Sequence, residues 1–230
     1  MPEFGDDGVA QLRQASVLIV GLGGTGAGAA LALAGAGVGT ITLNDFDDVD
    51  ESNLARQTLY RPQDVGKKKA LVAQAHLAEQ NPTITLNAIQ RRLDADELAH
   101  YVGAVDVVLD CCDNFSSRFA INRAAVATRT PLVSGAAIRW EGQISVFGPD
   151  YETGPCYQCL YQADDEGLDD CQGAGVVGPL PPMIGQLMAI EAIKKITGSG
   201  YPAAMLIYDA RSASWHSVNI NRREDCSVCG

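Results

Sequence analysis

The sequence has little positive charge and no long apolar run. Its 230 residues include 17 Lys and Arg against 28 Asp and Glu, a formal net charge of -11. Non-specific binding to nucleic acid needs cationic side chains that displace many phosphate counterions, so this balance argues against a nucleic-acid partner. No stretch approaches the roughly eighteen apolar residues of a membrane span, and no basic, apolar opening segment indicates secretion. We therefore expect a cytoplasmic protein with no membrane partner.

Histidine is also scarce. His76 and His100 fall on predicted helices and His216 on a predicted strand, where we expect them to lie at the surface or to pack. No Ser-His-Asp set is apparent. With 47% hydrophobic content and no internal repeat, residues 1–230 are expected to form one domain.

The first part of the chain alternates between predicted strands and helices. A β-branched run over residues 16–20 ends at Gly21 and precedes an Ala-rich helix over residues 25–36. Further strands are predicted at residues 39–45, 84–89 and 105–110, with helices at about 66–79, 94–102 and 116–128. This alternation is typical of a doubly wound, Rossmann-like α/β fold with a mostly parallel sheet.

The pattern changes after Pro131. Strands predicted at residues 132–138, 143–147, 205–209 and 215–221 suggest antiparallel additions at the C-terminal side of the sheet. Residues 164–182 are rich in Gly, Pro and Asp and lack periodicity, so we expect a mobile loop there. A helix over residues 184–196 is expected to complete the fold.

A glycine motif joins the first predicted strand to the first predicted helix. Gly21, Gly23 and Gly26 have the spacing G-x-G-x-x-G. In this position backbone N–H groups and the start of a helix can meet a phosphate. A tight turn without a ligand is the alternative, and the motif does not choose between a dinucleotide and ATP.

Polar residues after the second strand favour a triphosphate. Asp45 ends that strand, where a carboxylate can accept hydrogen bonds from ribose hydroxyls. Asn53, Arg56 and Lys69 follow, and such cations stabilise the charge that develops in phosphoryl or nucleotidyl transfer. Taken singly, Arg56 and Lys69 can also be solvated surface charges.

A second pair of carboxylates, Asp110 and Asp113, follows the strand at 105–110. This places them at the carboxyl edge of the sheet, where open α/β folds bind ligands. Asp113 is a candidate ligand of Mg²⁺, which favours one or two carboxylates together with phosphate oxygens. Its alternative role is to cap the helix that follows Asn114.

Four of the seven cysteines form two C-x-x-C pairs, namely Cys156 with Cys159 and Cys226 with Cys229. In a reducing compartment this spacing predicts a tetrahedral Cys₄ zinc site. Because all four thiolates would be consumed, the metal would be structural, tying the end of the chain to the domain. The alternative is two unrelated pairs of reduced cysteines.

The other three cysteines have different surroundings. Cys111 and Cys112 extend a buried strand and are expected to pack. Cys171 lies in the polar, Gly-rich segment, where an exposed thiol could take part in acyl or persulfide chemistry. An incidental loop cysteine is the alternative reading of Cys171.

These residues together resemble the ThiF/MoeB family, the bacterial relatives of ubiquitin-activating enzymes. The resemblance extends from about Ser16 to the end of the chain, with its motifs in the same order. They are Gly21-Leu-Gly-Gly-Thr-Gly26, Asp45-Phe-Asp47, Ser52-Asn-Leu-Ala-Arg-Gln57, Leu109-Asp-Cys-Cys-Asp-Asn114, Pro131-Leu-Val-Ser-Gly-Ala-Ala137 and the paired C-x-x-C motifs.

The resemblance implies an adenylyltransferase that uses ATP, Mg²⁺ and a structural Zn²⁺. Its substrate would be the C-terminal glycine carboxylate of a ubiquitin-like sulfur-carrier protein, ThiS-like for thiamine thiazole or MoaD-like for molybdopterin. It also implies a homodimer and a sulfurtransferase partner. Arg56, Lys69 and Asp113 would act in adenylation, and Cys171 matches the position at which family members join the carrier through sulfur. The implied nucleotide contacts are Gly21, Gly23, Gly24, Gly26, Asp45, Asp47, Asn53, Arg56, Gln57, Lys69, Asp113 and Asn114.

Two departures bear on activity. Family members usually begin with an Arg-Tyr-x-Arg-Gln segment whose arginine reaches the partner subunit's ATP site, and this sequence does not contain it. The segment is expected either to have been truncated or to be truly missing, with slower adenylation. Pro181-Pro182-Met183 stands where a more flexible stretch is usual and could alter the grip on the carrier tail.

Three alternative functions stay open from the sequence. A nicotinamide-dependent oxidoreductase uses the same fold. A non-catalytic carrier-binding scaffold would fit the missing arginine segment. A zinc-dependent nucleic-acid module is disfavoured by the charge of -11.

Overall fold

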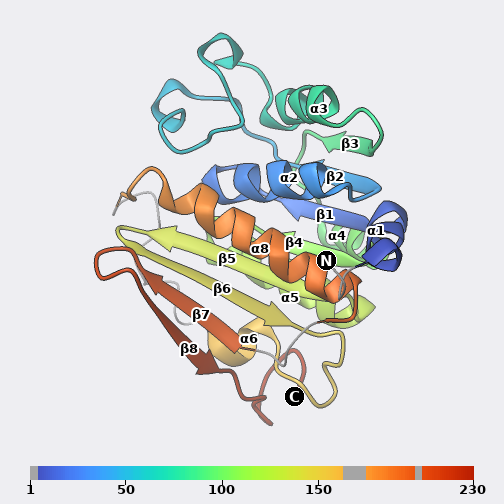
Figure 1. Ribbon diagram of the computed structural model, residues 1–230. Helices are drawn as coiled ribbons and strands as arrows, with labels where there is room; N and C mark the ends of the chain where they lie inside the picture. Colours follow the sequence, from blue (N-terminus) through green and yellow to red (C-terminus); the bar gives the residue numbers. More distant parts are fainter. Residues whose placement is uncertain (1–4, 163–174, 200–203) are drawn as a thin grey trace.

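A computed structural model describes residues 5–162, 175–199 and 204–230. Over these residues one eight-stranded sheet has the order β3-β2-β1-β4-β5-β6-β7-β8 (Figure 1). The strands are β1 (Ser16–Val20), β2 (Thr40–Asn44), β3 (Thr85–Ile89), β4 (Val107–Asp110), β5 (Leu132–Ile138), β6 (Glu141–Phe147), β7 (Ala204–Asp209) and β8 (Ser214–Asn219). The helices are α1 (Gly5–Gln14), α2 (Gly24–Ala36), α3 (Lys69–Gln80), α4 (Ala95–Gly103), α5 (Phe115–Thr128), α6 (Tyr157–Leu160) and α8 (Leu180–Ile196), with short 3₁₀ turns η1 (Glu51–Asn53) and η2 (Pro62–Asp64).

β3, β2, β1 and β4 are parallel, as predicted. β5, which was predicted among the antiparallel additions, also pairs parallel with β4, so that part of the prediction is wrong. Apolar residues fill β1 and β4 because helices cover both of their faces, leaving no solvent-exposed side. From β1 the chain winds outward through β2 to β3, then crosses back to β4 on the other side of β1. The strand order therefore reverses between β1 and β4, which defines the ligand-binding edge of such sheets.

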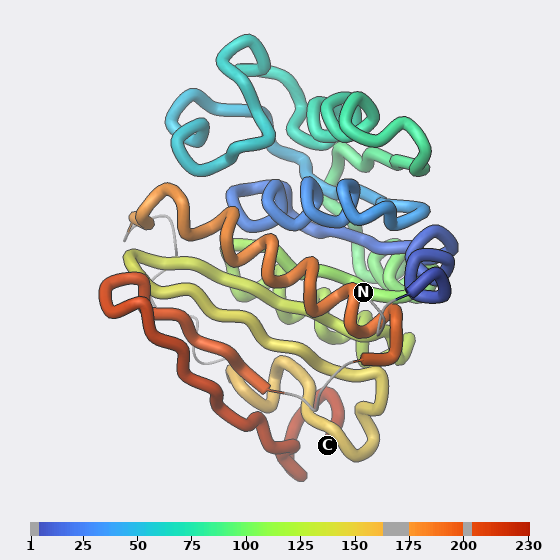
Figure 2. Tube along the Cα trace, viewed as in Figure 1, coloured from blue at the N-terminus to red at the C-terminus, as the bar shows by residue number. Residues whose placement is uncertain are grey.

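The last strands pair antiparallel, which also confirms the prediction. β5 and β6 form a hairpin in which Ile138 lies opposite Glu141, so β6 begins earlier than the predicted residue 143. β7 and β8 extend the sheet beyond β6. β3 and β8 are the two edge strands of this one sheet, and Figure 2 shows their segments (green and red) at opposite ends of the molecule.

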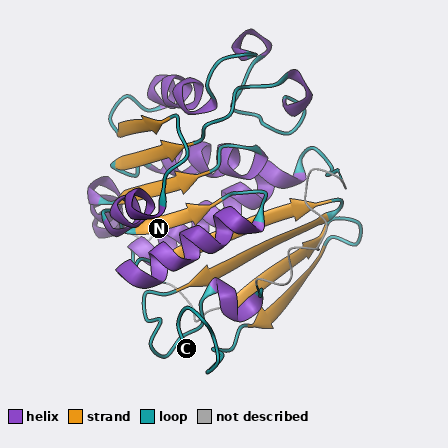
Figure 3. Cartoon of the chain, turned by 180° about the vertical axis from the view of Figure 1, so that it is seen from behind, coloured by secondary structure: helices purple, strands orange, loops and turns teal. Residues whose placement is uncertain are grey.

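Helices cover both faces of the sheet (Figures 1 and 3). On one face α2 packs against α8, and on the other α4 packs against α5. The approach of α2 and α8 is close because glycines line it. A Cβ at Gly185 would lie 2.0 Å from the carbonyl oxygen of Thr25, and one at Gly28 would lie 2.4 Å from that of Pro182. No helix in the described part of the chain has both the length and the apolar character of a membrane span.

Several boundaries differ from the predictions. The helix predicted from residue 184 begins at Leu180, with Pro181 and Pro182 in its first turn. Proline fits there because the first helical N–H groups have no intrahelical acceptor. The predicted loop at 164–182 therefore extends too far at its C-terminal end, because the helix begins at Leu180. Residues 164–174 of this predicted loop lie outside the described residues. Helices α1 and α6 were not predicted.

Candidate active site

A cleft of about 590 Å³ opens at the carboxyl ends of β1, β2, β4 and β5. This is the edge at which the strand order reverses and at which open α/β sheets bind ligands. Gly26 is the one predicted nucleotide contact outside its lining. The predicted contacts that line it are Gly21, Gly23, Gly24, Asp45, Asp47, Asn53, Arg56, Gln57, Lys69, Asp113 and Asn114.

The glycine turn has distinct structural demands at each position. Gly21 has φ of +89°, and a Cβ there would lie 2.8 Å from the carbonyl oxygen of Cys111. A Cβ at Gly26 would lie 1.9 Å from the carbonyl oxygen of Gly21, so Gly26 lets α2 pack on the turn. Gly23 is the N-cap of α2 and provides no capping side chain. The start of α2 thus presents an anion-binding end to the cleft.

Asp45 closes the turn from the next strand. Its carboxylate accepts the N–H of Leu22 at 2.7 Å and the N–H of Asp47 at 2.8 Å. Burial raises the pKa of Asp45, against the opposing effects of Lys69 and these two N–H groups. In doubly wound folds, an acid at the end of the second strand lies where it can accept hydrogen bonds from a ribose.

The two predicted cations, Arg56 and Lys69, line the same cleft. Lys69 is nearly buried, and its Nζ lies 3.1 Å from Oδ2 of Asp47. Arg56 donates to Oδ1 of Asn53 at 2.6 Å. Gln57 is 3% exposed, and its Oε1 is buried without a hydrogen-bond partner. The cations are thus held in place by neighbouring oxygens while lining the cleft.

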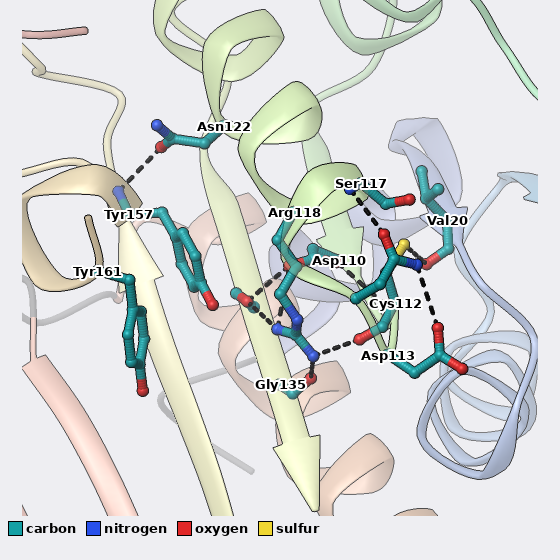
Figure 4. Close-up of polar contacts among 12 residues, drawn as sticks. Val20, Asp110, Cys112, Asp113, Ser117, Arg118, Asn122, Gly135, Tyr157 and Tyr161 are labelled. Atoms are coloured by element: carbon teal, nitrogen blue, oxygen red, sulfur yellow. Dashed lines mark hydrogen bonds and ion pairs between the residues drawn. The ribbon is translucent and has the colours of Figure 1, made fainter. Parts of the chain in front are cut away.

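Asp113 lies in the turn between β4 and α5, at the cleft (Figure 4). The N-cap of α5 is Asn114, whose Oδ1 accepts the N–H of Ser117 at 2.9 Å. The alternative role of Asp113 as the helix cap is therefore wrong, since Asn114 occupies that position. Asp113 instead accepts a hydrogen bond from Nδ2 of Asn114 at 3.2 Å.

Arg118 is a cleft residue that sequence reasoning missed. It lines the cleft from α5 yet is only 7% exposed. Its guanidinium contacts Oδ2 of Asp110 at 3.2 Å and Oγ of Ser134 at 2.9 Å (Figure 4). A lone arginine on a predicted helix gives no sequence signal of burial. The carboxylate of Asp110 at the end of a buried strand was the available hint.

Arg92 and Phe46 form another part of the lining that was not predicted. The guanidinium carbon of Arg92 lies 4.9 Å from the centroid of the Phe46 ring, a cation–π contact. Phe46 follows Asp45 directly, but Arg92 comes from the segment after β3. Only the order of the strands in the sheet shows that Arg92 lies beside Phe46.

The four C-x-x-C cysteines come together, as predicted. Their sulfur atoms all lie within 4.8 Å of one another. The Sγ atoms of Cys156 and Cys226 are 3.7 Å apart, and those of Cys159 and Cys229 are 3.4 Å apart. Tetrahedral zinc, with Zn–S bonds of about 2.3 Å, places two sulfurs about 3.8 Å apart. The sulfur set therefore fits a metal ion of this kind.

Polar groups around the cluster also suit thiolates. Nδ2 of Asn122 lies 3.5 Å from Sγ of Cys156, and the backbone N–H of Arg223 points to Sγ of Cys159 at 3.5 Å. Such N–H donors stabilise metal-bound sulfur.

The remaining cysteines agree with the packing prediction where they can be placed. Cys111 and Cys112 pack against the two hydrophobic clusters of the domain and also line the cleft. Burial raises the pKa of both thiols, which disfavours a reactive thiolate. Cys171 lies outside the described residues.

A glycine turn, an acid after β2 and two cations around one cleft are the arrangement typical of nucleotide-binding proteins of the doubly wound α/β class. The cysteine cluster adds a candidate metal site at the end of the chain. The sequence matches the ThiF family over residues 1–228, and the chain belongs to that family.

Curated relatives and solved structures agree with this family. The Escherichia coli K12 protein named sulfur carrier protein ThiS adenylyltransferase is 46% identical, covering 97% of this chain and 89% of the relative. Molybdopterin-synthase adenylyltransferase of the same strain is also 46% identical, covering 99% and 92%. A crystal structure of E. coli MccB with ATP has a TM-score of 0.84 at 27% identity, covering 97% of this chain and 68% of that one. The predicted family and the predicted enzyme class, an adenylyltransferase, are confirmed.

Proposed function

We propose that this chain uses ATP to adenylate the C-terminal glycine carboxylate of a ubiquitin-like sulfur-carrier protein. The carrier would be ThiS-like or MoaD-like, as in the names of the relatives. The observation that carries the proposal is the cleft at the strand-order reversal. It gathers the glycine turn, Asp45 and the cations Arg56 and Lys69 around one space.

The residues present fit ATP. The start of α2 and the glycine turn would receive phosphates, because backbone N–H groups there favour anions. Asp45 would accept from the ribose hydroxyls. The buried Oε1 of Gln57 has no protein donor, so a bound ligand or its water would satisfy it. We assign Asn53, Arg56 and Lys69 to the phosphates.

Two metal ions would serve different purposes. Asp113 would hold Mg²⁺ together with phosphate oxygens, and that ion supplies neutralisation of the triphosphate's charge. Cys156, Cys159, Cys226 and Cys229 would hold Zn²⁺. Four sulfur ligands leave no open position for a water, so this zinc would be structural.

The chemistry needs alignment more than proton transfer. The carrier's terminal carboxylate is ionised at neutral pH and needs no general base. One carboxylate oxygen forms a bond to the α-phosphorus while the bond to the bridging oxygen breaks and pyrophosphate leaves. Arg56 and Lys69 would stabilise the negative charge during this exchange.

A path for the carrier tail is offered by small side chains. Gly135, Ala136 and Ala137 of β5 line the same cleft as the nucleotide residues. A tail that ends in glycine needs little width, so it would reach the α-phosphorus over this part of β5. The acyl-adenylate would then meet a sulfur nucleophile, supplied by a sulfurtransferase or by Cys171. We further propose that the chain works as a homodimer in the cytoplasm.

The test is ATP–pyrophosphate exchange with a purified ThiS-like or MoaD-like carrier. Exchange is expected to depend on the carrier and to be lost in Asp113→Ala. Asp96→Ala, which removes an exposed acid of α4 outside the cleft, is the matched control and should leave exchange intact. Cys171→Ser should also leave exchange intact, because its thiol would act after adenylation.

Exchange that is equally fast without carrier, or undiminished in Asp113→Ala, would overturn the proposal. Calorimetry separates the alternatives. Binding of Mg·ATP without carrier-dependent exchange favours a carrier-binding scaffold. Tight binding of NAD without binding of Mg·ATP favours an oxidoreductase.

A further inference from the structure

The buried guanidinium of Arg118 joins the ends of two strands at the floor of the cleft. One nitrogen, Nη1, contacts Oδ2 of Asp110 and Oγ of Ser134. The other, Nη2, donates to the carbonyl oxygen of Gly135 at 2.9 Å and to that of Cys112. The planar guanidinium thus has acceptors from β4, from the turn after it and from β5 (Figure 4).

These contacts begin where strand pairing ends. The parallel register between β4 and β5 runs only to Asp110 opposite Ser134. Beyond that pair, the turn at Cys112 and the next residue of β5, Gly135, have no ladder between them. Arg118 supplies donors to both carbonyls, so it replaces the ladder at the point where the cleft opens.

The same contacts separate the roles of the two acids after β4. Asp110 is 1% exposed and is committed to Arg118, to the Ser134 hydroxyl at 2.7 Å and to the N–H of Cys112 at 3.1 Å. Its charge is balanced by Arg118 within the protein. Asp113 follows Cys112 directly and lies at the exposed end of the same turn. Arg118 therefore sets the position of the turn that carries Asp113.

We propose that Arg118 is a positioning residue for metal-bound ATP, acting through the turn that carries Asp113. The inference rests on the proposed function, in which Asp113 holds Mg²⁺. Lysine cannot replace arginine in this role, because an ammonium is a point charge without the planar fork that reaches several acceptors at once. Nucleotide contacts at the glycine turn and at Asp45 do not involve Arg118.

The test is calorimetry of ATP binding to Arg118→Lys, with Mg²⁺ or with excess chelator. Affinity for Mg·ATP is expected to fall roughly tenfold to a hundredfold, the usual effect of removing a partner that orients a metal ligand. Affinity for metal-free ATP should stay unchanged. Arg123→Lys, an exposed arginine on the same helix, is the matched control and should bind both forms as the parent protein does.

A double-mutant cycle with Asp113→Asn identifies the route. If Arg118 acts through Asp113, Arg118→Lys should weaken Mg·ATP binding little further in the Asp113→Asn background. Additive losses, equal losses for metal-free and metal-bound ATP, or no loss would each overturn the proposal. Ser134→Ala keeps the guanidinium but removes one acceptor, so it gives a milder second variant with the same expected selectivity should Arg118→Lys fail to fold.

The outcome is separable from that of the proposed function. The cycle measures only binding of Mg·ATP, whereas adenylation is measured by carrier-dependent exchange. A parent protein that binds Mg·ATP and shows the expected coupling but catalyses no exchange keeps the role of Arg118 and loses the adenylation. Normal exchange with additive binding losses keeps the adenylation and overturns the proposed role of Arg118.

Discussion

Lys69 is a charged residue in a nearly buried position, and it forms an ion pair with a carboxylate that is much more exposed. The Lys69 side chain is 7% exposed, whereas that of Asp47 is 56% exposed. If the lysine is removed, the carboxylate of Asp47 can still be hydrated. The pair therefore contributes little to folding compared with a pair that is buried on both sides. Its place in the cleft is better explained by a ligand.

We predict that Lys69→Met weakens ATP binding far more than it weakens the fold. Loss of a charge-assisted contact to phosphate costs about 1.5 to 3 kcal/mol, or roughly tenfold to a hundredfold in affinity. Thermal unfolding should shift by only a few degrees. Lys68→Met removes a half-buried neighbour that pairs with Asp48 and does not line the cleft, so this control should leave affinity unchanged. Calorimetry and a thermal melt of both variants decide, and equal affinity losses would contradict the prediction.

Asp45 has a pKa raised by burial, which makes its contribution to stability depend on pH. The native state holds this proton more tightly than the unfolded chain, where the ordinary value is 3.8. Native Asp45 therefore costs no stability while protonated, and the cost develops as pH rises above 3.8 through the raised pKa. The full cost is present once the pH exceeds the raised pKa of native Asp45.

The predicted consequence is a pH-dependent difference between Asp45→Asn and the parent protein. Asparagine cannot ionise, so the stability of Asp45→Asn relative to the parent should increase as pH rises from about 4 to 7. Urea denaturation at several pH values in this window measures the difference. A constant difference, or one that moves against Asp45→Asn with rising pH, would contradict the sign. Asp45→Asn should also bind ATP more weakly than the parent protein does.

At this scale the sequence predicts residues whose chemistry is local. The spacing of Gly21, Gly23 and Gly26 and the pairing of the cysteines are visible in the linear chain because each motif is nearly complete within a few residues. Arg118 is different. Its acceptors come from two strands that meet only in the folded sheet, and nothing about its own neighbours shows that it is buried.

Elements are predicted well in kind and less well at their ends. β4 is predicted from its apolar run, since a parallel strand covered on both faces is apolar. β5 is predicted as a strand but as part of the antiparallel additions, because its closeness in sequence to β6 does not show that it also pairs parallel with β4. The start of α8 was missed because Pro181 and Pro182 read as helix breakers. They are tolerated in the first turn, and only the packing of α8 on α2 shows that the helix already begins at Leu180.

The contact of α8 with α2 gives an element-scale prediction. A Cβ at Gly185 would lie 2.0 Å from the backbone oxygen of Thr25 and 2.7 Å from the backbone nitrogen of Ala29, so Gly185→Ala must push α8 away. We expect a loss of about 1 to 3 kcal/mol or more in stability. Weaker ATP binding should accompany it, because α2 begins at the glycine turn.

Gly35→Ala is the matched control within α2. A Cβ there would meet only the terminal nitrogen of the Gln80 side chain, at 3.2 Å, and this flexible group can move. Alanine favours a helix over glycine by up to about 1 kcal/mol, so Gly35→Ala should be neutral or stabilising. Urea denaturation of the two variants measures both effects. A Gly185→Ala protein as stable as Gly35→Ala would show that the helices separate without cost.

At the scale of the whole molecule, helix α5 connects the cleft to the cysteine cluster. Arg118 lies at the cleft floor, and Asn122, one turn later on α5, contacts Tyr157 (Figure 4) and Cys156 of the cluster. Nδ2 of Asn122 contacts Sγ of Cys156, while its Oδ1 accepts the N–H of Tyr157 at 2.9 Å. A metal held by the cysteines would therefore hold α5 against the sheet, and with it the residues that α5 presents to the cleft.

This connection predicts that Asn122→Asp releases the proposed zinc more readily. Aspartate keeps an acceptor for Tyr157 but replaces the donor to Cys156 with a negative charge beside a thiolate. Metal affinity should fall by about tenfold to a hundredfold, as measured by competition with a chromophoric chelator. The midpoint of thermal unfolding should fall too, because a structural metal stabilises only the folded chain. In excess chelator the parent protein also loses the stabilisation that the metal provides. The difference between the unfolding midpoints of the parent and of Asn122→Asp should therefore narrow. The control, Arg123→Gln, should match the parent in both conditions. A gap of unchanged size would mean that Asn122 stabilises α5 through packing and Tyr157 alone, independently of any metal.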